Sequence, residues 1–109
     1  MNHPEAAYEV KSRVTVAEAP NLRVRELALA EGQCVPWHHH THITDTFFCM
    51  EGPMLVCTRK PDARHVLHPG GKLAVGPGTP HRVTGLGDGA CRFMIVQGVG
   101  TYDYVPAQD

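Results

Sequence analysis

The sequence has no block of lysine or arginine, no long apolar run and no strong excess of either charge. Its 10 basic and 11 acidic residues give a net charge of −1, so nothing marks a nucleic acid or an anionic membrane as a partner. No apolar run approaches the roughly 18 residues of a membrane-spanning helix. The N-terminal segment 1–13 has no apolar stretch typical of a secretory signal. We therefore expect a cytoplasmic protein without a nucleic-acid or membrane partner.

The cysteines do not form a recognisable framework. No pair has the Cys-x-x-Cys spacing of many metal and redox sites, and each cysteine lies in or beside an apolar run. In a chain without a secretory signal, such residues are typically buried free thiols rather than disulfides. The prediction applies to Cys34, Cys49, Cys57 and Cys91.

The sequence also lacks a long helical period of 3.6 residues, and its 11 glycines and 9 prolines are spread along the chain. This punctuation predicts short β-strands separated by turns. At 109 residues we expect one all-β domain, residues 1–109, built as a sandwich or barrel. The predicted strands are 22–30, 37–42, 46–50, 54–59, 64–68, 72–75, 80–84, 90–97 and 102–105.

Segment 90–97 is apolar on both faces of a strand, because Cys91, Phe93 and Ile95 alternate with Met94 and Val96. A strand of this kind is typically covered on both faces. The interior of one small barrel covers only one face of this strand and one face of strand 22–30, so the second apolar face of each strand remains outside. The sequence therefore predicts a homodimer whose interface covers the outer faces.

Histidines are concentrated in the run His38-His39-His40-Thr41-His42, and His81 lies in a Pro/Gly-rich turn further on. Side chains two residues apart in a strand point to the same face, so His38 and His40 are expected to project together and His39 outward. Neutral imidazole is the commonest metal ligand, and the pattern predicts a mononuclear site. His42 shares this parity, and we expect it to support a ligand from behind or to lie at the rim rather than to ligate. The histidines that belong to no motif and are expected at the surface are His3, His65 and His68.

Two glycine-bounded patterns surround these histidines. Residues 32–52 read Gly32-(x5)-His38-x-His40-(x4)-Asp45-(x6)-Gly52, and residues 70–85 contain Gly70-(x7)-Gly78-(x2)-His81. They resemble the first and second motifs of the cupin superfamily. Three differences are visible: Asp45 replaces the usual glutamate, Gly76 takes the usual proline position beside Pro77, and Gly85 stands where asparagine is sometimes found.

The resemblance implies a small double-stranded β-helix, a jelly-roll barrel, with a metal inside the barrel mouth. It places the ligands at His38, His40 and His81, with Asp45 at the carboxylate position. Three imidazoles and a carboxylate suit one divalent transition metal ion. Iron is favoured, and manganese, nickel, copper and zinc also fit. The motifs indicate the fold more strongly than the chemistry, because this fold hosts many activities.

The sequence leaves the role of Asp45 open. Its carboxylate is withdrawn by about 1.5 Å, one C–C bond, relative to a glutamate. It therefore ligates only if the backbone moves inward; otherwise it bonds a ligand histidine or a metal-bound water, or caps the turn into the next strand. Phe47 and Cys49 share its parity and are expected to line the pocket floor, whereas Trp37 and Phe48 are expected to point the other way.

Two functions fit these residues. The first is a cupin-type dioxygenase that acts on a small organic substrate held in the barrel, with Asp45 and His42 as the only candidates for a catalytic base. The alternative is a non-catalytic module that binds or senses a small ligand, with a structural or incidental metal. A cupin that binds no metal is the third interpretation.

Overall fold

The computed structural model describes residues 8–108, which form β-strands and no helix. Within this range no segment is therefore a helix long and apolar enough to cross a membrane. The strands are β1 (Ser12–Ala19), β2 (Leu22–Leu29), β3 (Cys34–His39), β4 (Thr44–Glu51), β5 (Met54–Thr58), β6 (Ala63–Leu67), β7 (Lys72–Val75), β8 (His81–Gly85), β9 (Cys91–Gly98) and β10 (Val105–Pro106).

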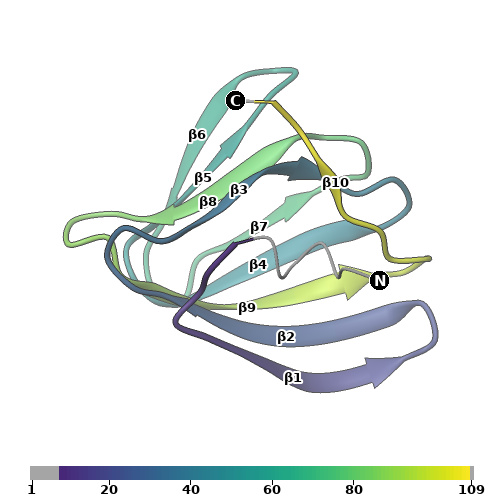
Figure 1. Cartoon of the computed structure of the whole chain (residues 1–109), viewed down its shortest axis with the longest axis horizontal. Coiled ribbons are helices and arrows are strands. Elements are labelled where there is room, and N and C mark those ends of the chain that lie inside the picture. Colours follow the sequence, from purple (N-terminus) through teal and green to yellow (C-terminus); the bar gives the residue numbers. More distant parts are fainter. Residues whose placement is uncertain (1–7, 109) are drawn as a thin grey trace.

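The strands form two five-stranded antiparallel sheets that face each other (Figure 1). One sheet has the order β1-β2-β9-β4-β7 and the other the order β10-β3-β8-β5-β6. From β3 onward the chain passes repeatedly from one sheet to the other, so that strands distant in sequence become neighbours. This arrangement is the all-β jelly roll expected from the sequence, and it brings β3, β4 and β8 around one end of the barrel.

Every predicted strand overlaps an observed one, but strand β1 was not among the predictions. β1 is an edge strand that pairs only with β2. Its two valines, Val14 and Val16, are 51% and 53% exposed. All residues of β1 from Val14 to Ala19 are exposed, so this edge strand has no buried apolar face, which explains why the alternation did not mark it as part of the barrel wall.

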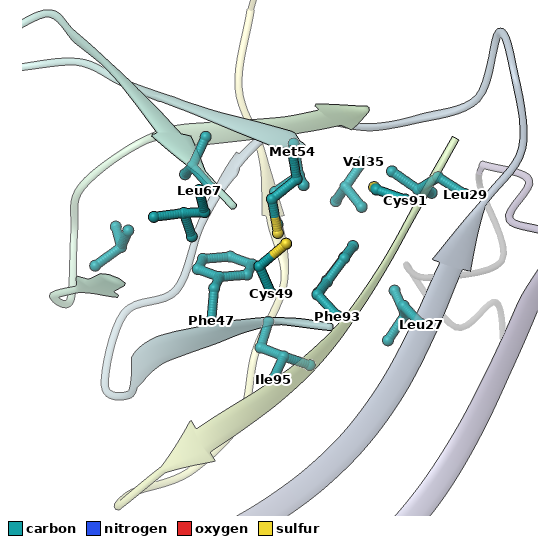
Figure 2. Packing of buried hydrophobic residues seen from close by; sticks show 13 residues of the cluster. Leu27, Leu29, Val35, Phe47, Cys49, Met54, Leu67, Cys91, Phe93 and Ile95 are labelled. Atoms are coloured by element: carbon teal, nitrogen blue, oxygen red, sulfur yellow. The ribbon is translucent and has the colours of Figure 1, made fainter. Parts of the chain in front are cut away.

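The core lies between the two sheets (Figure 2). Along β9, Cys91, Phe93 and Ile95 point inward and are buried, whereas the intervening side chains are half-buried. Phe47 of β4 lies beside Phe93, with 5.7 Å between ring centroids. Burial of such side chains is the main favourable term in folding, and it fixes the inward face of β4 from which Asp45 projects.

The four cysteines are free thiols, as predicted. Cys49 and Cys91 are buried in the core, whereas Cys34 and Cys57 are half-buried. Burial raises the pKa of the Cys91 thiol to about 11, and the nearby Cys49 contributes to this shift. Both buried thiols therefore stay protonated and act as packing groups.

Candidate metal centre

His38, His40, Asp45 and His81 come together at one end of the barrel. His38 lies on β3, His40 one residue beyond its end, Asp45 on β4 and His81 at the start of β8. His38 and His81 are register partners in neighbouring strands. All four side chains are buried, with exposures of 3% or less. One potential ligand atom from each residue lies within 4.8 Å of all the others.

The Asp45 carboxylate lies at the centre of this group. Its Oδ2 atom is 2.7 Å from His40 Nε2 and 2.7 Å from His81 Nε2, and 3.9 Å from His38 Nε2. The shorter aspartate side chain thus reaches the imidazole nitrogens directly. Of the roles that the sequence left open for Asp45, contact with the histidines is the one that the structure shows.

The three imidazoles are held in one tautomer by the backbone. Each Nδ1 lies within hydrogen-bond distance of a carbonyl oxygen, which can only accept, so each Nδ1 carries the hydrogen and donates it. These oxygens belong to Pro36 for His38 (2.7 Å), Asp103 for His40 (2.5 Å) and Thr79 for His81 (2.9 Å). In the neutral ring the Nε2 lone pair then faces the centre of the site, as metal ligation requires.

This donor set calls for a cation. A carboxylate oxygen and two imidazole lone pairs at 2.7 Å repel one another unless a proton or a metal ion lies between them. Three nitrogen donors and one oxygen donor suit a borderline divalent transition metal. The residues present therefore fit the metal that the sequence predicted.

Protonation of the group follows from burial and from the central carboxylate. Burial, reinforced by the charge of His81, lowers the pKa of His38 to about 3. Burial also opposes protonation of His40, but its hydrogen bond to Asp45 and the charge of that carboxylate raise the His40 pKa above its ordinary value. Burial likewise opposes ionisation of Asp45, yet hydrogen bonds from His40 and His81 hold its pKa well below the usual range.

The loop before β8 aims His81 through backbone geometry. Gly78 has φ = +77°, a conformation that favours glycine. Its backbone N–H donates to the carbonyl oxygen of His40 over 2.7 Å, which ties the loop to the end of β3. The second glycine-bounded motif thus positions His81 within the cluster.

A family model described as "Cupin domain" matches residues 25–97. This span includes all four clustered residues and eight of the ten strands wholly or largely. The chain belongs to the cupin family. Its fold, its two glycine-bounded motifs and its buried His/Asp cluster agree with this assignment.

Solved structures with the same fold include other cupins and enzymes. The chain is 22% identical to a double-stranded β-helix protein from Klebsiella pneumoniae, with a TM-score of 0.75 and coverage of 90% of this chain and 84% of that one. An oxalate oxidase is 19% identical, with a TM-score of 0.73 and coverage of 87% of this chain and 53% of that one. KdgF from Halomonas sp. is 17% identical, with a TM-score of 0.70 and coverage of 88% and 90%. A comparison with curated proteins gives no significant match.

In this cupin a narrow cavity adjoins the cluster. Its volume is about 30 Å³, room for about two or three water molecules. His38, His40 and Asp45 line it, as does Phe47, which the sequence had assigned to the pocket. Tyr104 stacks on His38 with 4.6 Å between ring centroids. The cavity therefore accommodates an ion together with a few further atoms.

Two residues predicted for the site lie elsewhere. Cys49 is buried in the core and does not line the cavity, because β4 carries it farther from the barrel mouth than Phe47. His42 is exposed on the turn between β3 and β4 and is not part of the cluster. The chain turns away at Thr41, whose backbone N–H and hydroxyl both bond the Asp103 carboxylate.

The remaining predicted positions follow the strand pattern. Trp37 is half-buried outside the cavity, beneath the Arg59 guanidinium at 3.8 Å, and Phe48 is 37% exposed. His39 is half-buried opposite Val105 rather than fully outward, because β10 covers that edge of β3. His68 is exposed and His65 half-buried. His3 lies outside the described residues.

Sequence reasoning missed several residues that line the cavity. Gln97 donates to Asp45 Oδ1 over 3.2 Å, and it continues the buried series of Cys91, Phe93 and Ile95 at the same parity. Arg25 precedes the buried Leu27 by two residues, so its inward direction was also readable from the strand period. The cavity is also lined by an arginine and three tyrosines that had no assigned role, namely Arg13, Tyr8, Tyr102 and Tyr104, and by apolar residues of the core.

Proposed function

We propose that this cupin binds one divalent transition metal ion, with iron favoured, through His38, His40, His81 and Asp45, and that it is a metal-dependent oxygenase acting on a small organic substrate. The observation that carries the proposal is the convergence of three backbone-fixed imidazoles on one buried carboxylate. A bound ion of this class acts as a Lewis acid or binds oxygen.

The chain's own contribution is to orient the donors and to exclude water. Gln97 holds Asp45 Oδ1 at 3.2 Å, and the carbonyl oxygens behind the rings keep each Nε2 directed inward. Phe47 is 1% exposed and closes the inner side of the cavity. Asp45 is the catalytic candidate that the cavity contains, since His42 is exposed.

The likeness to an oxalate oxidase supports oxidative chemistry on a small substrate only at the level of the shared fold. A specific observation favours the alternative, a module that binds or senses a small ligand. Asp45 already accepts bonds from His40, His81 and Gln97, so it is not a free base. This arrangement suits ligand binding as well as turnover.

The two functions separate in one experiment. Protein purified without a nickel column is analysed for metal and then loaded with iron, manganese, nickel or copper. Oxygen uptake is recorded with a panel of diketones, catechols and thiols. Metal-dependent oxygen consumption with at least one of them is the expected result. Saturable binding across the panel without oxygen uptake supports the binding module instead. If the protein binds none of these metals, both the metal site and the metal-dependent oxygenase are refuted.

A further inference from the structure

A second and larger cavity adjoins the one beside the metal cluster. This outer cavity lies between the β1–β2 turn and the segment that follows β9, at the same end of the sheet (Figure 1). Its volume is about 570 Å³, whereas the inner cavity beside the cluster measures about 30 Å³. Sites for small organic molecules usually measure about 300–1,000 Å³. The outer cavity therefore has room for an organic molecule, and the inner cavity has room only for a few of its atoms.

Two side chains form the wall between the cavities. Gln97 and Tyr102 are the residues that line both of them. On the inner side, Gln97 donates to Asp45 Oδ1 over 3.2 Å, and the Tyr102 ring lies beside the His40 ring with 5.2 Å between centroids. The wall is thus one side chain thick at each of these residues, and movement of either side chain joins the two cavities.

Arg23 holds both residues of this wall from the outer side. It lines the outer cavity, and its Nε donates to Gln97 Oε1 over 3.0 Å. Its guanidinium carbon lies 3.9 Å from the centre of the Tyr102 ring. Arg23, Gln97 and Asp45 are register partners on β2, β9 and β4, so the strands fix the row that connects the outer cavity to the carboxylate. One arginine side chain therefore determines the position of both wall residues.

Tyr102 is the part of the wall that lies outside the strands. The segment that carries it is anchored on both sides: the Gly100 N–H donates to the carbonyl oxygen of Asn21 over 2.8 Å, and the Asp103 carboxylate accepts from Thr41. Rotation of the Tyr102 side chain, rather than displacement of the segment, is therefore the movement that opens the wall.

We propose that the outer cavity binds the organic body of the substrate and that the metal-ligating end of the substrate enters between Gln97 and Tyr102. Arg23 is the positioning residue that holds this passage closed. The substrate is accordingly a chelating group of a few atoms joined to a body too large for the inner cavity. The proposal rests on the proposed function for the existence of a substrate, but the passage is a property of the metal-free protein as well.

The passage is tested in metal-free protein with diethyl pyrocarbonate, which acylates neutral imidazole nitrogens and is larger than the inner cavity. Arg23→Ala is expected to speed acylation of His38, which lines the inner cavity, by about tenfold or more, because the hydrogen bond and the cation–π contact that hold the wall are lost. Peptide mass spectrometry gives the rate, with the exposed His68 as internal reference. Arg92→Ala is the matched control and should leave the rate unchanged, because Arg92 pairs with Glu51 on the same sheet.

The core thiols separate opening of the wall from unfolding. Cys49 and Cys91 are buried, so a thiol reagent labels them only when the barrel opens. Their labelling in Arg23→Ala should be as slow as in the wild type. Leu22→Trp, which fills part of the outer cavity, should slow acylation of His38 and still decides if Arg23→Ala misfolds by circular dichroism. An unchanged His38 rate in either folded variant, or a rise that the core thiols match, overturns the passage.

Binding of the substrate body is tested with two hydroxamates that share one chelating group. Acetohydroxamate and benzohydroxamate are titrated calorimetrically into the zinc-loaded protein. Leu22→Trp should weaken benzohydroxamate binding by about tenfold or more through overpacking of the outer cavity, and it should leave acetohydroxamate binding unchanged. Equal loss for both probes, or loss for neither, overturns the role of the outer cavity. Elemental analysis is the separate check on the metal: if no zinc is bound, the proposed function fails, and the acylation rates alone decide the passage.

Discussion

Gln97 donates its side-chain amide to Asp45 Oδ1 over 3.2 Å, while the other carboxylate oxygen, Oδ2, faces His40 and His81. Behind Gln97, Arg23 Nε donates to Gln97 Oε1 over 3.0 Å. The carboxylate is therefore held at both oxygens. A glutamine from β9 thus fixes the orientation of the aspartate that stands where the first cupin motif has the longer glutamate.

Replacing Gln97 tests whether it orients the carboxylate. Gln97→Leu removes the donor to Oδ1, and we expect metal affinity to fall by about 10–100-fold, the usual effect of losing a partner behind a ligand. Gln97→Glu places a second carboxylate against Asp45 and should reduce affinity further. Calorimetric titration of metal into each variant measures the effect. Arg23→Gln, one step farther from the metal, provides the graded control and should change affinity less. Unchanged affinity in Gln97→Leu removes Gln97 from the site.

The two histidines His81 and His39 provide a matched pair. His81→Ala removes one of three converging nitrogens and should abolish stoichiometric metal binding. His39→Ala removes a side chain that does not belong to the cluster and should keep one ion per chain. Elemental analysis after removal of free metal distinguishes the variants. If both keep full occupancy, the assignment of the site is wrong.

Substitutions at Asp45 distinguish a ligand from an orienting group. Because Oδ2 lies 2.7 Å from two imidazole nitrogens, we expect Asp45→Asn to weaken metal binding by more than about 100-fold, beyond the range for outer partners. Asp45→Glu restores the charge and the residue usual in the family, and should recover much of the affinity. Metal titration of the two variants gives the comparison. Wild-type affinity in Asp45→Asn instead means that Asp45 acts only on the histidines.

The strand period made the site largely readable from the sequence. Side chains two residues apart share a face, so the common direction of His38 and His40 could be derived from spacing. The place of Asp45 came from the resemblance to the first cupin motif. The positions of residues near the ends of the strands could not be predicted in this way, because they depend on where the chain leaves the strand. His42 has the parity of a ligand, but β3 ends at His39 and the turn carries His42 into solvent. Cys49 has the parity of Phe47, but it lies deeper in the core than the cavity extends.

Residues contributed by distant segments were beyond sequence reasoning for a different reason. The carbonyl oxygen of Asp103 meets His40 Nδ1, with 62 residues between the two positions, and Tyr104 stacks on His38. Such contacts are set by the packing of the C-terminal segment over the barrel mouth, which no local pattern encodes. Gln97 lies between these two cases: the strand period indicated that its side chain points inward, but no sequence pattern indicated its contact with Asp45.

Metal binding should release a proton and weaken as the pH falls. Metal competes with protons for imidazole nitrogens. The His40 pKa is raised above its ordinary value of 6.5, so in metal-free protein this ring holds a proton at pH 6. The His38 pKa is lowered to about 3, so His38 is already neutral there. Below the His40 pKa, affinity should drop by at least about tenfold per pH unit, the slope for one displaced proton.

Titrations of zinc at several pH values and in buffers of different ionisation enthalpy measure both the slope and the number of protons released. Manganese serves as a control for effects peculiar to one metal. A flat affinity between pH 5 and 7 contradicts the placement of that proton on His40.

We predict a homodimer from the exposed apolar residues on the outer face of the β1-β2-β9-β4-β7 sheet. Val14 and Phe48 on this face are 51% and 37% exposed, and Val24, Met94 and Val96 lie between them as half-buried residues. In register, Val24 pairs with Val96, and Phe48 with Met94, so the apolar side chains form a stripe across β2, β9 and β4. Val14 on β1 is opposite Glu26 and is a diagonal neighbour of Val24. A stripe of this kind on a small protein typically marks an interface.

Light scattering should accordingly give twice the chain mass, with dissociation on dilution. Met94→Lys places a charge at the centre of the stripe and should give a monomer, because burial of an unpaired charge at an interface is strongly unfavourable. Val66→Lys provides the control: Val66 is 48% exposed but lies on β6 in the other sheet, so the dimer should persist. A wild-type mass equal to one chain at all concentrations contradicts the dimer, and dissociation by Val66→Lys instead of Met94→Lys places the interface on the other sheet.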